Sequence, residues 1–290
     1  MTGQSTNRTR LTETAYAKIN LALHVRRRRD DGYHDLETLF AFLDAGDDLI
    51  VTPADVDCLT IGGEFADGLS TGPDNLVLRA LDAMRALVPA GGAPIPPLAI
   101  HLEKHLPVAS GIGGGSADAA AMVRLLDRHF VHLGDAGQLG QAMRHLGADV
   151  SACIMSETRV GHGDGSDLHM VNADDVRGMP LLLVNPCVPL ATGPVFAGWD
   201  GVDRGELPSG AALAIARAGR NDLERPALAL CPDIDEVLGV LRAQLPRLSR
   251  MSGSGATCFA LFNSMDQMQS AAIRIADDHP EWWVMGGQIR

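Results

Sequence analysis

The chain has 290 residues, of which 46% are hydrophobic and 21% charged, so we expect a globular protein with a substantial core divided into two domains. Its formal net charge of -12 argues against a nucleic-acid or anionic-membrane partner. No stretch reaches the roughly 20 apolar residues of a membrane span, and residues 1–14 lack the apolar core of a secretion signal. The cysteines form no Cys-x-x-Cys pair. We therefore expect a cytoplasmic protein with buried thiols and neither disulfides nor a zinc site.

The first half of the chain alternates predicted strands and helices. Apolar residues at every second position from 17 to 25 predict a strand with one face in a core, which leaves Lys18, Asn20 and His24 on the other face. Asp74 and Pro89 mark the start and the end of a predicted helix. The other elements expected here are strands at 49–52 and 99–103 and helices at 117–130 and 139–146, the last ending at Gly147.

The periodicity is interrupted near residue 160, where glycines lie among aspartates and histidines. We therefore predict a nucleotide-binding domain over residues 1–165 and a smaller domain over residues 166–290. The elements expected in the second domain are strands at 180–184, 258–262 and 282–285, a helix at 234–241 and a last helix capped by Ser264. This alternation is typical of a small α+β sandwich, and the fold class expected for the chain is α+β.

Residues 107–121 predict a binding site for phosphates. Four glycines, at positions 111 and 113–115, precede an alanine-rich run that favours a helix. Glycine backbones can point several N–H groups into one concave site, and a helix that starts near Ser116 adds the positive end of its dipole. A Walker loop does not fit, because it needs a lysine after its last glycine and no lysine follows Lys104. A dinucleotide fingerprint does not fit, because Ser116 stands where its last glycine is needed. A third kind of nucleotide site is indicated, and a flexible glycine turn is the alternative.

Further short segments occur with this loop in the order and rough spacing of one family: Ala17-Lys18-Ile19-Asn20-Leu21, Asp31-Gly32-Tyr33-His34, Asp74-Asn75-Leu76, Leu146-Gly147-Ala148-Asp149-Val150 and Ser252-Gly253-Ser254-Gly255-Ala256. On these segments the chain resembles the GHMP small-molecule kinases over nearly its whole length. The resemblance implies a two-domain GHMP kinase fold: an N-terminal nucleotide-binding α/β domain, a ferredoxin-like C-terminal α+β sandwich and an active site in the cleft between them. It also implies ATP-dependent phosphorylation of the 2-hydroxyl of a cytidine-diphosphate-linked methylerythritol, a step of non-mevalonate isoprenoid biosynthesis that uses Mg²⁺.

The resemblance assigns catalysis to Asp149 and Lys18. Asp149 would accept the proton of the substrate hydroxyl as this group attacks the γ-phosphate in line, although the residue pattern alone fits the N-cap of a helix equally well. Lys18 would stand beside this carboxylate, where it would keep the carboxylate ionised, lower the pKa of the hydroxyl or stabilise charge on the γ-phosphate. The sequence does not separate these three roles, and a solvated strand lysine is the alternative.

The nucleotide side of the site is assigned to the glycine loop and two other residues. The oxygens of Asn75 and Ser116 would meet phosphate or metal, and Lys104 resembles a second family lysine near the nucleotide. Mg²⁺ keeps several waters when bound, so Ser116 is the one metal ligand expected. The complete set implied for the nucleotide is Asn75, Lys104, Pro107, Val108, Ala109, Ser110, Gly111, Ile112, Gly113, Gly114, Gly115 and Ser116.

The cytidine pocket is assigned to Tyr33 and His34. Tyr33 would stack on the base, and His34 would hydrogen-bond the cytosine edge and give selectivity. The other substrate-binding residues implied are Asn20, Asp149, Phe196, Gly253 and Ser254. A plain turn with a core contact is the alternative for Tyr33 and His34, and a hairpin turn is the alternative for residues 252–256.

Two positions depart from the family pattern without removing a functional group: Ser151 and Tyr16 each stand where proline is usual. The arginine run at 26–29 is expected to face mostly solvent, and the alternative is that one arginine approaches the diphosphate of the substrate. Two other functions stay open, namely another GHMP kinase acting on mevalonate, homoserine or a sugar, and a nucleotide sensor without turnover. Partners are expected to be small molecules, with the protein a monomer or homodimer.

Overall fold

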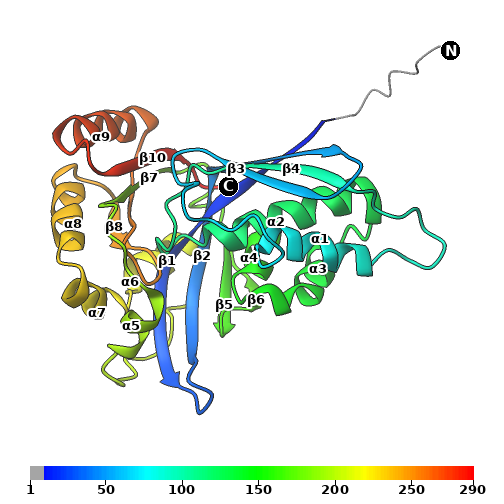
Figure 1. Cartoon of the computed structure of the whole chain (residues 1–290). Helices are drawn as coiled ribbons and strands as arrows, with labels where there is room; N and C mark the ends of the chain where they lie inside the picture. Colours follow the sequence, from blue (N-terminus) through cyan, green and yellow to red (C-terminus); the bar gives the residue numbers. More distant parts are fainter. Residues whose placement is uncertain (1–9) are drawn as a thin grey trace.

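The computed structural model describes residues 10–290, and in this range the chain forms two sheets with helices packed against them (Figure 1). The first sheet has the order β3-β4-β2-β5-β6, with β1 paired to β2 outside this path, and the second has the order β10-β7-β9-β8. The strands are β1 (Leu11–Arg28), β2 (His34–Pro53), β3 (Cys58–Gly62), β4 (Leu98–Glu103), β5 (Arg159–Gly163), β6 (Asp167–Met170), β7 (Pro180–Asn185), β8 (Leu248–Met251), β9 (Cys258–Leu261) and β10 (Trp283–Gln288).

The helices divide between the two sheets. Figure 1 shows α1 to α4 gathered against the first sheet and α8 and α9 on the outer side of the second. The helices are α1 (Leu76–Ala86), α2 (Gly114–Leu126), α3 (Ala136–Ala142), α4 (Val150–Met155), α5 (Thr192–Ala197), α6 (Ala212–Ala218), α7 (Glu224–Leu230), α8 (Asp233–Ala243) and α9 (Met265–Asp278). A π-helical turn (Asp127–Val131) extends α2, and a 3₁₀ turn (Arg144–Leu146) precedes Gly147.

β1 and β2 form the long antiparallel ribbon on which the molecule is built. Their register shifts between Tyr16 and Lys18, between Asn20 and Ala22, and between Val25 and Arg27, and such irregularities bend a strand and re-aim its side chains. All residues from 17 to 25 are buried, so the expectation that only one face of this strand lies in a core is wrong. α2 packs against β1, and other residues of β1 join a core cluster with strands of the second sheet, a contact between distant segments that periodicity does not show.

Most predicted elements are confirmed, with shifted ends. The helix expected from Asp74 begins later, because Asn75 is its N-cap and accepts the N–H of Val77. α2 begins at Gly114 instead of residue 117, so the glycines belong to its first turn. The buried strand expected at 180–184 is β7, and Ser264 caps α9 as predicted by accepting the N–H of Gln267.

The two sheets change over between Met170 and Pro180. β6 pairs with β5 of the first sheet, so this sheet extends to Met170, and β7 opens the second sheet at Pro180. The division into domains at residue 165 stays a prediction. Of the cysteines expected to be buried, Cys58 and Cys187 are exposed. None of the helices formed within residues 10–290 combines the length and apolar character that crossing a membrane requires.

Candidate active site

A cleft of about 1070 Å³ lies where the two sheets and the glycine loop meet. A smaller pocket of about 230 Å³ adjoins it, because Leu76, Ala109, Gly114 and Gly115 line both. The predicted residues that line the larger cleft are Lys18, Asn20, Tyr33, His34, Ala109, Ser110, Gly111, Gly113, Gly114, Gly115, Ser116, Asp149, Phe196, Gly253 and Ser254. Those that line the smaller pocket are Asn75, Lys104, Pro107, Val108, Ala109, Gly114 and Gly115.

Lys18 and Asp149 form an ion pair in the cleft. The Nζ of Lys18 lies 3.1 Å from Oδ2 of Asp149, although 131 residues separate them in the chain (149 minus 18). The lysine side chain is 5% exposed and the carboxylate 35%, so the ammonium is fixed in the wall while the carboxylate faces the cleft. Asp149 precedes α4 at the N-cap position, but its side chain makes no capping hydrogen bond. The carboxylate is therefore free to act on a bound group.

The glycine loop presents an uncapped helix end to this ion pair. Gly113, the N-cap of α2, has a φ of 67° and no side chain to cap the first N–H groups, which have no partners within the helix. A Cβ at Gly113 would lie 3.1 Å from Cε of Lys18, so the position has no room for a side chain unless the lysine moves. Free N–H groups and the helix dipole next to the ammonium make this corner attractive to phosphate.

The turn at residues 252–256 is both a hairpin turn and a wall of the cleft. It joins β8 to β9, and it packs on the glycine loop: Ser252 Oγ donates to the carbonyl of Gly111 (3.2 Å) and accepts the N–H of Asn20 (3.1 Å). Gly111 has a φ of 76°, and a Cβ there would lie 2.5 Å from the carbonyl oxygen of Ser252. A serine from the second half of the chain thus fixes both the loop and the strand that carries Lys18.

An aromatic pocket lies at the other end of the cleft. Tyr33 is 69% exposed, and the buried His34 packs against Phe196 with ring centroids 5.1 Å apart. Arg28 Nε donates to Nε2 of His34 at 3.3 Å and lines the cleft, so one arginine of the run at 26–29 approaches the site. Burial, followed by the charge of Arg28, lowers the pKa of His34, so the ring is neutral at neutral pH.

Lys104, the only other lysine of the chain, lies at the floor of the smaller pocket but is held by the protein itself. Its Nζ donates to Asp47 (2.5 Å) and to Asp118 (2.8 Å), and all three side chains are buried. Asp47 also accepts the N–H groups of His105 and Leu106, where the chain leaves β4 for the glycine loop. Burial raises the pKa of Asp118 to about 8. This cluster ties the loop to the sheet, in contrast to the simple nucleotide contact expected of Lys104.

Two other residues expected at the nucleotide have structural roles. Asn75 lines the smaller pocket, but its side-chain oxygen already accepts the N–H of Val77, and its Nδ2 donates to the carbonyl of Ser70. Its oxygen caps the helix with one lone pair, so the side chain has a structural role besides the nucleotide contact expected of it. The side chain of Ile112 is fully buried in the core and lines neither pocket; its carbonyl accepts the N–H of Lys18.

The residues around Ser116 fit a magnesium ion that is held mainly by phosphate and water. Within residues 10–290 no group of three or more His, Cys, Asp and Glu side chains is arranged to hold a metal. Ser116 and Asp149 supply a hydroxyl and a carboxylate in the same cleft, and oxygen donors of this kind suit Mg²⁺. A site completed by a triphosphate needs no more from the protein.

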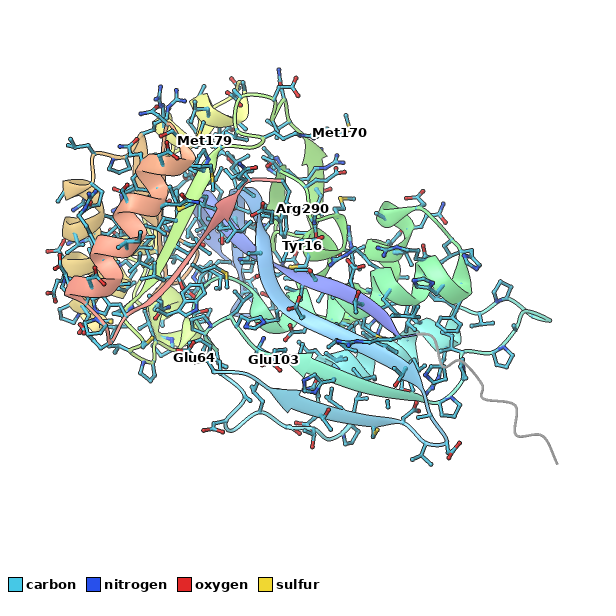
Figure 2. The ribbon with its side chains drawn as sticks, turned by 90° about the horizontal axis from the view of Figure 1, so that it is seen from above. Tyr16, Glu64, Glu103, Met170, Met179 and Arg290 are labelled. Atoms are coloured by element: carbon cyan, nitrogen blue, oxygen red, sulfur yellow. The ribbon has the colours of Figure 1, made fainter. Side chains whose placement is uncertain are left out.

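The two departures from the family pattern have local structural explanations. Ser151 Oγ donates to the carbonyl of Gly140 at 2.8 Å and so joins α4 to α3. Tyr16 lies under Arg290, whose Cζ is 3.5 Å from the ring centroid, and Figure 2 shows these two side chains close together. Arg124 also approaches the ring of Tyr16, at 5.3 Å. Neither residue lines the cleft.

Sequence reasoning missed several residues that shape the cleft. Thr38, Arg144 and Asp164 line it, and Asp47 fixes the loop from below. Thr38 left a weak signal, since it is a hydroxyl residue directly before the apolar run over 39–43. Asp47 lies among other aspartates and Arg144 beside a histidine, without a motif around either, so their positions become evident only from the contacts that the fold creates.

Comparison with known proteins agrees with this geometry. The GHMP kinases N terminal domain model matches residues 75–157, and the GHMP kinases C terminal model matches residues 207–281. A 4-diphosphocytidyl-2-C-methyl-D-erythritol kinase of Sphingopyxis alaskensis is 56% identical over 97% of this chain and 99% of its own. A crystal structure of 4-(cytidine 5'-diphospho)-2C-methyl-D-erythritol kinase superposes with a TM-score of 0.74 at 31% identity, covering 96% of this chain and 99% of the other.

Solved structures of kinases with other names share the fold at lower sequence identity. A homoserine kinase from Cytophaga hutchinsonii superposes with a TM-score of 0.69 at 17% identity, covering 100% of this chain and 97% of the other, which shows a shared fold alone. The expected two-domain fold is confirmed by the family models and by the full-length superposition. With both family models matched and a relative more than half identical over nearly its whole length, this chain belongs to the GHMP kinase family.

Proposed function

We propose that this chain transfers the γ-phosphoryl group of ATP to the 2-hydroxyl of 4-diphosphocytidyl-2-C-methyl-D-erythritol, giving the 2-phosphate and ADP. The observation that carries the proposal is the ion pair of Lys18 and Asp149, placed between an uncapped helix end and an aromatic pocket. The names of the relatives and the length of the similarity support the choice of substrate.

The two pockets suggest how both substrates would lie. The adenine base would enter the smaller pocket, which Leu76 and Leu102 line with apolar surface, and the triphosphate would cross Gly114 and Gly115, which border both spaces. The cytosine would lie at the far end of the cleft against Tyr33. The alcohol and the γ-phosphate would then meet near Lys18, halfway between the two bases.

The chemistry is an in-line displacement at phosphorus. The 2-hydroxyl oxygen forms a bond to the γ-phosphorus while the bond from phosphorus to the β,γ-bridging oxygen breaks and ADP leaves. The hydroxyl proton passes to the carboxylate of Asp149, and the ammonium of Lys18 stabilises the charge on the transferred group. Mg²⁺, when bound near Ser116, would neutralise phosphate charge. Because this transition state is loose, positioning contributes more than the basicity of the aspartate.

The rival functions predict different behaviour. A nucleotide sensor without turnover needs neither a buried ammonium nor a free carboxylate, yet Lys18 and Asp149 are both present and paired. A kinase for mevalonate, homoserine or a sugar shares the fold but has no use for the pocket formed by Tyr33, His34 and Phe196. The cytoplasmic location and the monomeric or dimeric state stay predictions.

Release of ADP by the purified protein tests the proposal. With ATP and Mg²⁺, we expect ADP to form when the cytidylylated alcohol is supplied, and not with mevalonate, homoserine or no acceptor. Asp149→Asn, measured in parallel, separates turnover by this site from a contaminating kinase. Turnover of mevalonate or homoserine, or none with the cytidylylated alcohol, would contradict the assignment.

A further inference from the structure

Thr38 ends a chain of buried hydrogen bonds that starts at the Lys18–Asp149 pair. The Nζ of Lys18 donates to Oδ1 of Asn20 at 2.9 Å, Nδ2 of Asn20 donates to Oγ1 of Thr38 at 2.7 Å, and Oγ1 of Thr38 donates to the carbonyl of Ala22 at 2.8 Å. Lys18, Asn20 and Thr38 are 4%, 3% and 1% exposed, so solvent cannot replace these partners. Hydrogen bonds in such surroundings are costly to leave unmade.

The direction of each hydrogen bond in this chain is determined. A lysine ammonium only donates, so the atom of Asn20 that faces it must be the oxygen. The amide nitrogen then points to Thr38, and the hydroxyl can accept from it because its own proton is used by the carbonyl of Ala22. Thr38 thus serves as the acceptor that keeps the amide oxygen turned toward Lys18.

The sheet brings these residues together through an irregularity in β1. Asn20 pairs with Phe40 and Leu23 pairs with Thr38, with a register shift between Asn20 and Ala22. Phe40 and Thr38 are two residues apart on β2 and share one face of the strand, so Thr38 lies diagonally across from Asn20. The ring of Phe40 lies under the ammonium, with 5.4 Å between Nζ of Lys18 and the ring centroid.

This arrangement holds the ammonium of Lys18 in place. Its nitrogen donates a hydrogen bond to Asn20 and lies 3.1 Å from the carboxylate of Asp149, and within residues 10–290 it has no other hydrogen-bond or ion-pair partner. The hydrogen bond to Asn20 fixes one N–H, and attraction to Asp149 holds the charge at the cleft that Lys18 lines. We propose that Thr38 is a positioning residue for phosphoryl transfer, which orients the Asn20 amide and through it the ammonium of Lys18 that faces the transferred phosphoryl group. This proposal rests on the proposed kinase function.

Thr38→Val tests the proposal, because valine keeps the shape of threonine and removes the hydroxyl. The Asn20 amide then has no acceptor and loses its fixed orientation. We expect kcat to fall about 10-fold, with KM for ATP and for the alcohol within about 2-fold of wild type, since the effect falls on the transition state. Thr38→Ser restores the hydroxyl and should return kcat to within about 3-fold of wild type.

Thr158→Val is the matched control. Thr158 is also a buried threonine, 6% exposed, but within the described part of the chain its hydroxyl has no hydrogen-bond partner. The same substitution there should leave kcat unchanged. If T158V lowered kcat as much as T38V, the loss would reflect packing in the sheet, and the proposal would be wrong.

A double-mutant cycle with Asn20→Ala shows whether Thr38 acts through the amide. If it does, the double variant N20A/T38V has the same kcat as N20A within about 2-fold, because the second change removes nothing further. Losses that multiply would contradict the proposal, as would a folded T38V with wild-type kcat. Wild-type turnover in the same assay tests the kinase function separately, because its absence refutes that function whatever the variants do.

NMR of the wild-type protein gives a test that does not depend on whether T38V folds. With nitrogen-15 in the asparagine side chains, the Asn20 amide should give a pair of proton signals that exchange slowly with solvent, identified by their disappearance in N20A. Fast exchange of this pair would show that the amide is not held by Thr38 and would refute the proposal.

Discussion

Replacing Lys18 by methionine removes the cation beside the reacting groups and keeps the approximate volume of the side chain. Asp149 loses its partner at 3.1 Å, and Oδ1 of Asn20 loses its donor. The carboxylate is 35% exposed, so water can hydrate it after the substitution. Lys18 does not line the smaller pocket proposed for adenine, and the aromatic side chains proposed to hold the cytosine are other residues of the cleft. We therefore expect the K18M protein to fold and to bind both substrates.

The size of the effect follows from the distance. Two unit charges 3.1 Å apart interact by about 5 kcal/mol at an effective dielectric constant of about 20, and exposure of the carboxylate reduces this value. A single positioned donor to a transition-state oxyanion contributes about 3–4 kcal/mol. Each 1.36 kcal/mol is about tenfold in rate, so we expect kcat to fall about 10²–10³-fold. KM for ATP and for the alcohol should change by less than about 3-fold.

Lys104→Met is the informative comparison, because both lysines are buried and ion-paired. Lys104 stands between Asp47 and Asp118, and without it the Asp47 carboxylate lies buried without a cation, next to an Asp118 carboxyl whose pKa burial raises to about 8. Leaving buried charges uncompensated in this way costs about 3–5 kcal/mol of stability. K104M should therefore lower the free energy of unfolding, measured by denaturant titration, whereas K18M should change it by less than about 2 kcal/mol.

Steady-state kinetics and denaturant unfolding of the two variants, measured side by side, check this reasoning. K18M should lose turnover with little change in stability, and K104M should lose stability. A folded K18M that retains more than about a tenth of wild-type kcat would show that its charge is not aimed at the transition state. The role assigned to the ammonium would then be wrong.

Four further predictions concern the carboxylate of Asp149, the glycine loop, the aromatic pocket and a buried histidine. Asp149→Asn should reduce kcat at least about 100-fold while ATP still binds, as measured by calorimetry, and a variant with normal turnover would remove this carboxylate from the mechanism. Gly111→Ala should lower the free energy of unfolding, measured in denaturant, by at least about 2 kcal/mol, because the φ of Gly111 is 76° and the new Cβ would lie 2.5 Å from the carbonyl oxygen of Ser252. An unchanged midpoint of denaturant unfolding would show that the loop and the turn are not packed as described. Tyr33→Ala should raise KM for the cytidylylated alcohol about 10-fold and leave KM for ATP unchanged, since a base stacked on an aromatic ring gains about 1–3 kcal/mol; equal changes in both constants would speak against a pyrimidine site. His24 is fully buried, with Nδ1 donating to Gly205 and Nε2 accepting the N–H of Arg220, and burial, with the charge of Arg220, lowers its pKa below 6.5. As pH falls, His24 is therefore protonated in the unfolded chain before it is protonated in the folded chain. The stability that neutral His24 contributes is present above pH 6.5 and is lost below it. Tm should drop between pH 7.5 and 5.5, and it should drop less in His24→Gln.

The parts of the fold that local pattern determines were predictable. Alternation indicated β1, a continuous apolar run indicated β7 and a helical stripe indicated α8. Ser264 was recognisable as a cap because capping depends on neighbours three residues away. The burial of both faces of β1 was not predictable, since the second sheet that covers it comes more than 150 residues later. Long-range packing leaves little trace in the periodicity of one strand.

The candidate site shows the same division. Glycines at 111 and 113–115 indicated a phosphate loop because only this residue type leaves the backbone uncovered. The choice between an N-cap and a free carboxylate for Asp149 required coordinates, because both readings put the residue at the start of a helix. The resemblance assigned Lys104 to the nucleotide, and its buried contact with Asp47 was not predictable because that residue lies on another strand, 57 residues away in sequence. Thr38 gained a role only once the register of β1 on β2 was known.

Phosphorus-31 NMR of a reaction mixture follows the transferred phosphoryl group itself and so tests whether this chain phosphorylates the alcohol. With ATP, Mg²⁺ and the cytidylylated alcohol, we expect the γ-phosphate signal of ATP to decline while a phosphomonoester signal grows and the diphosphate signals of the alcohol persist. Growth of inorganic phosphate alone, or a phosphomonoester that forms from mevalonate or homoserine instead, would contradict this expectation.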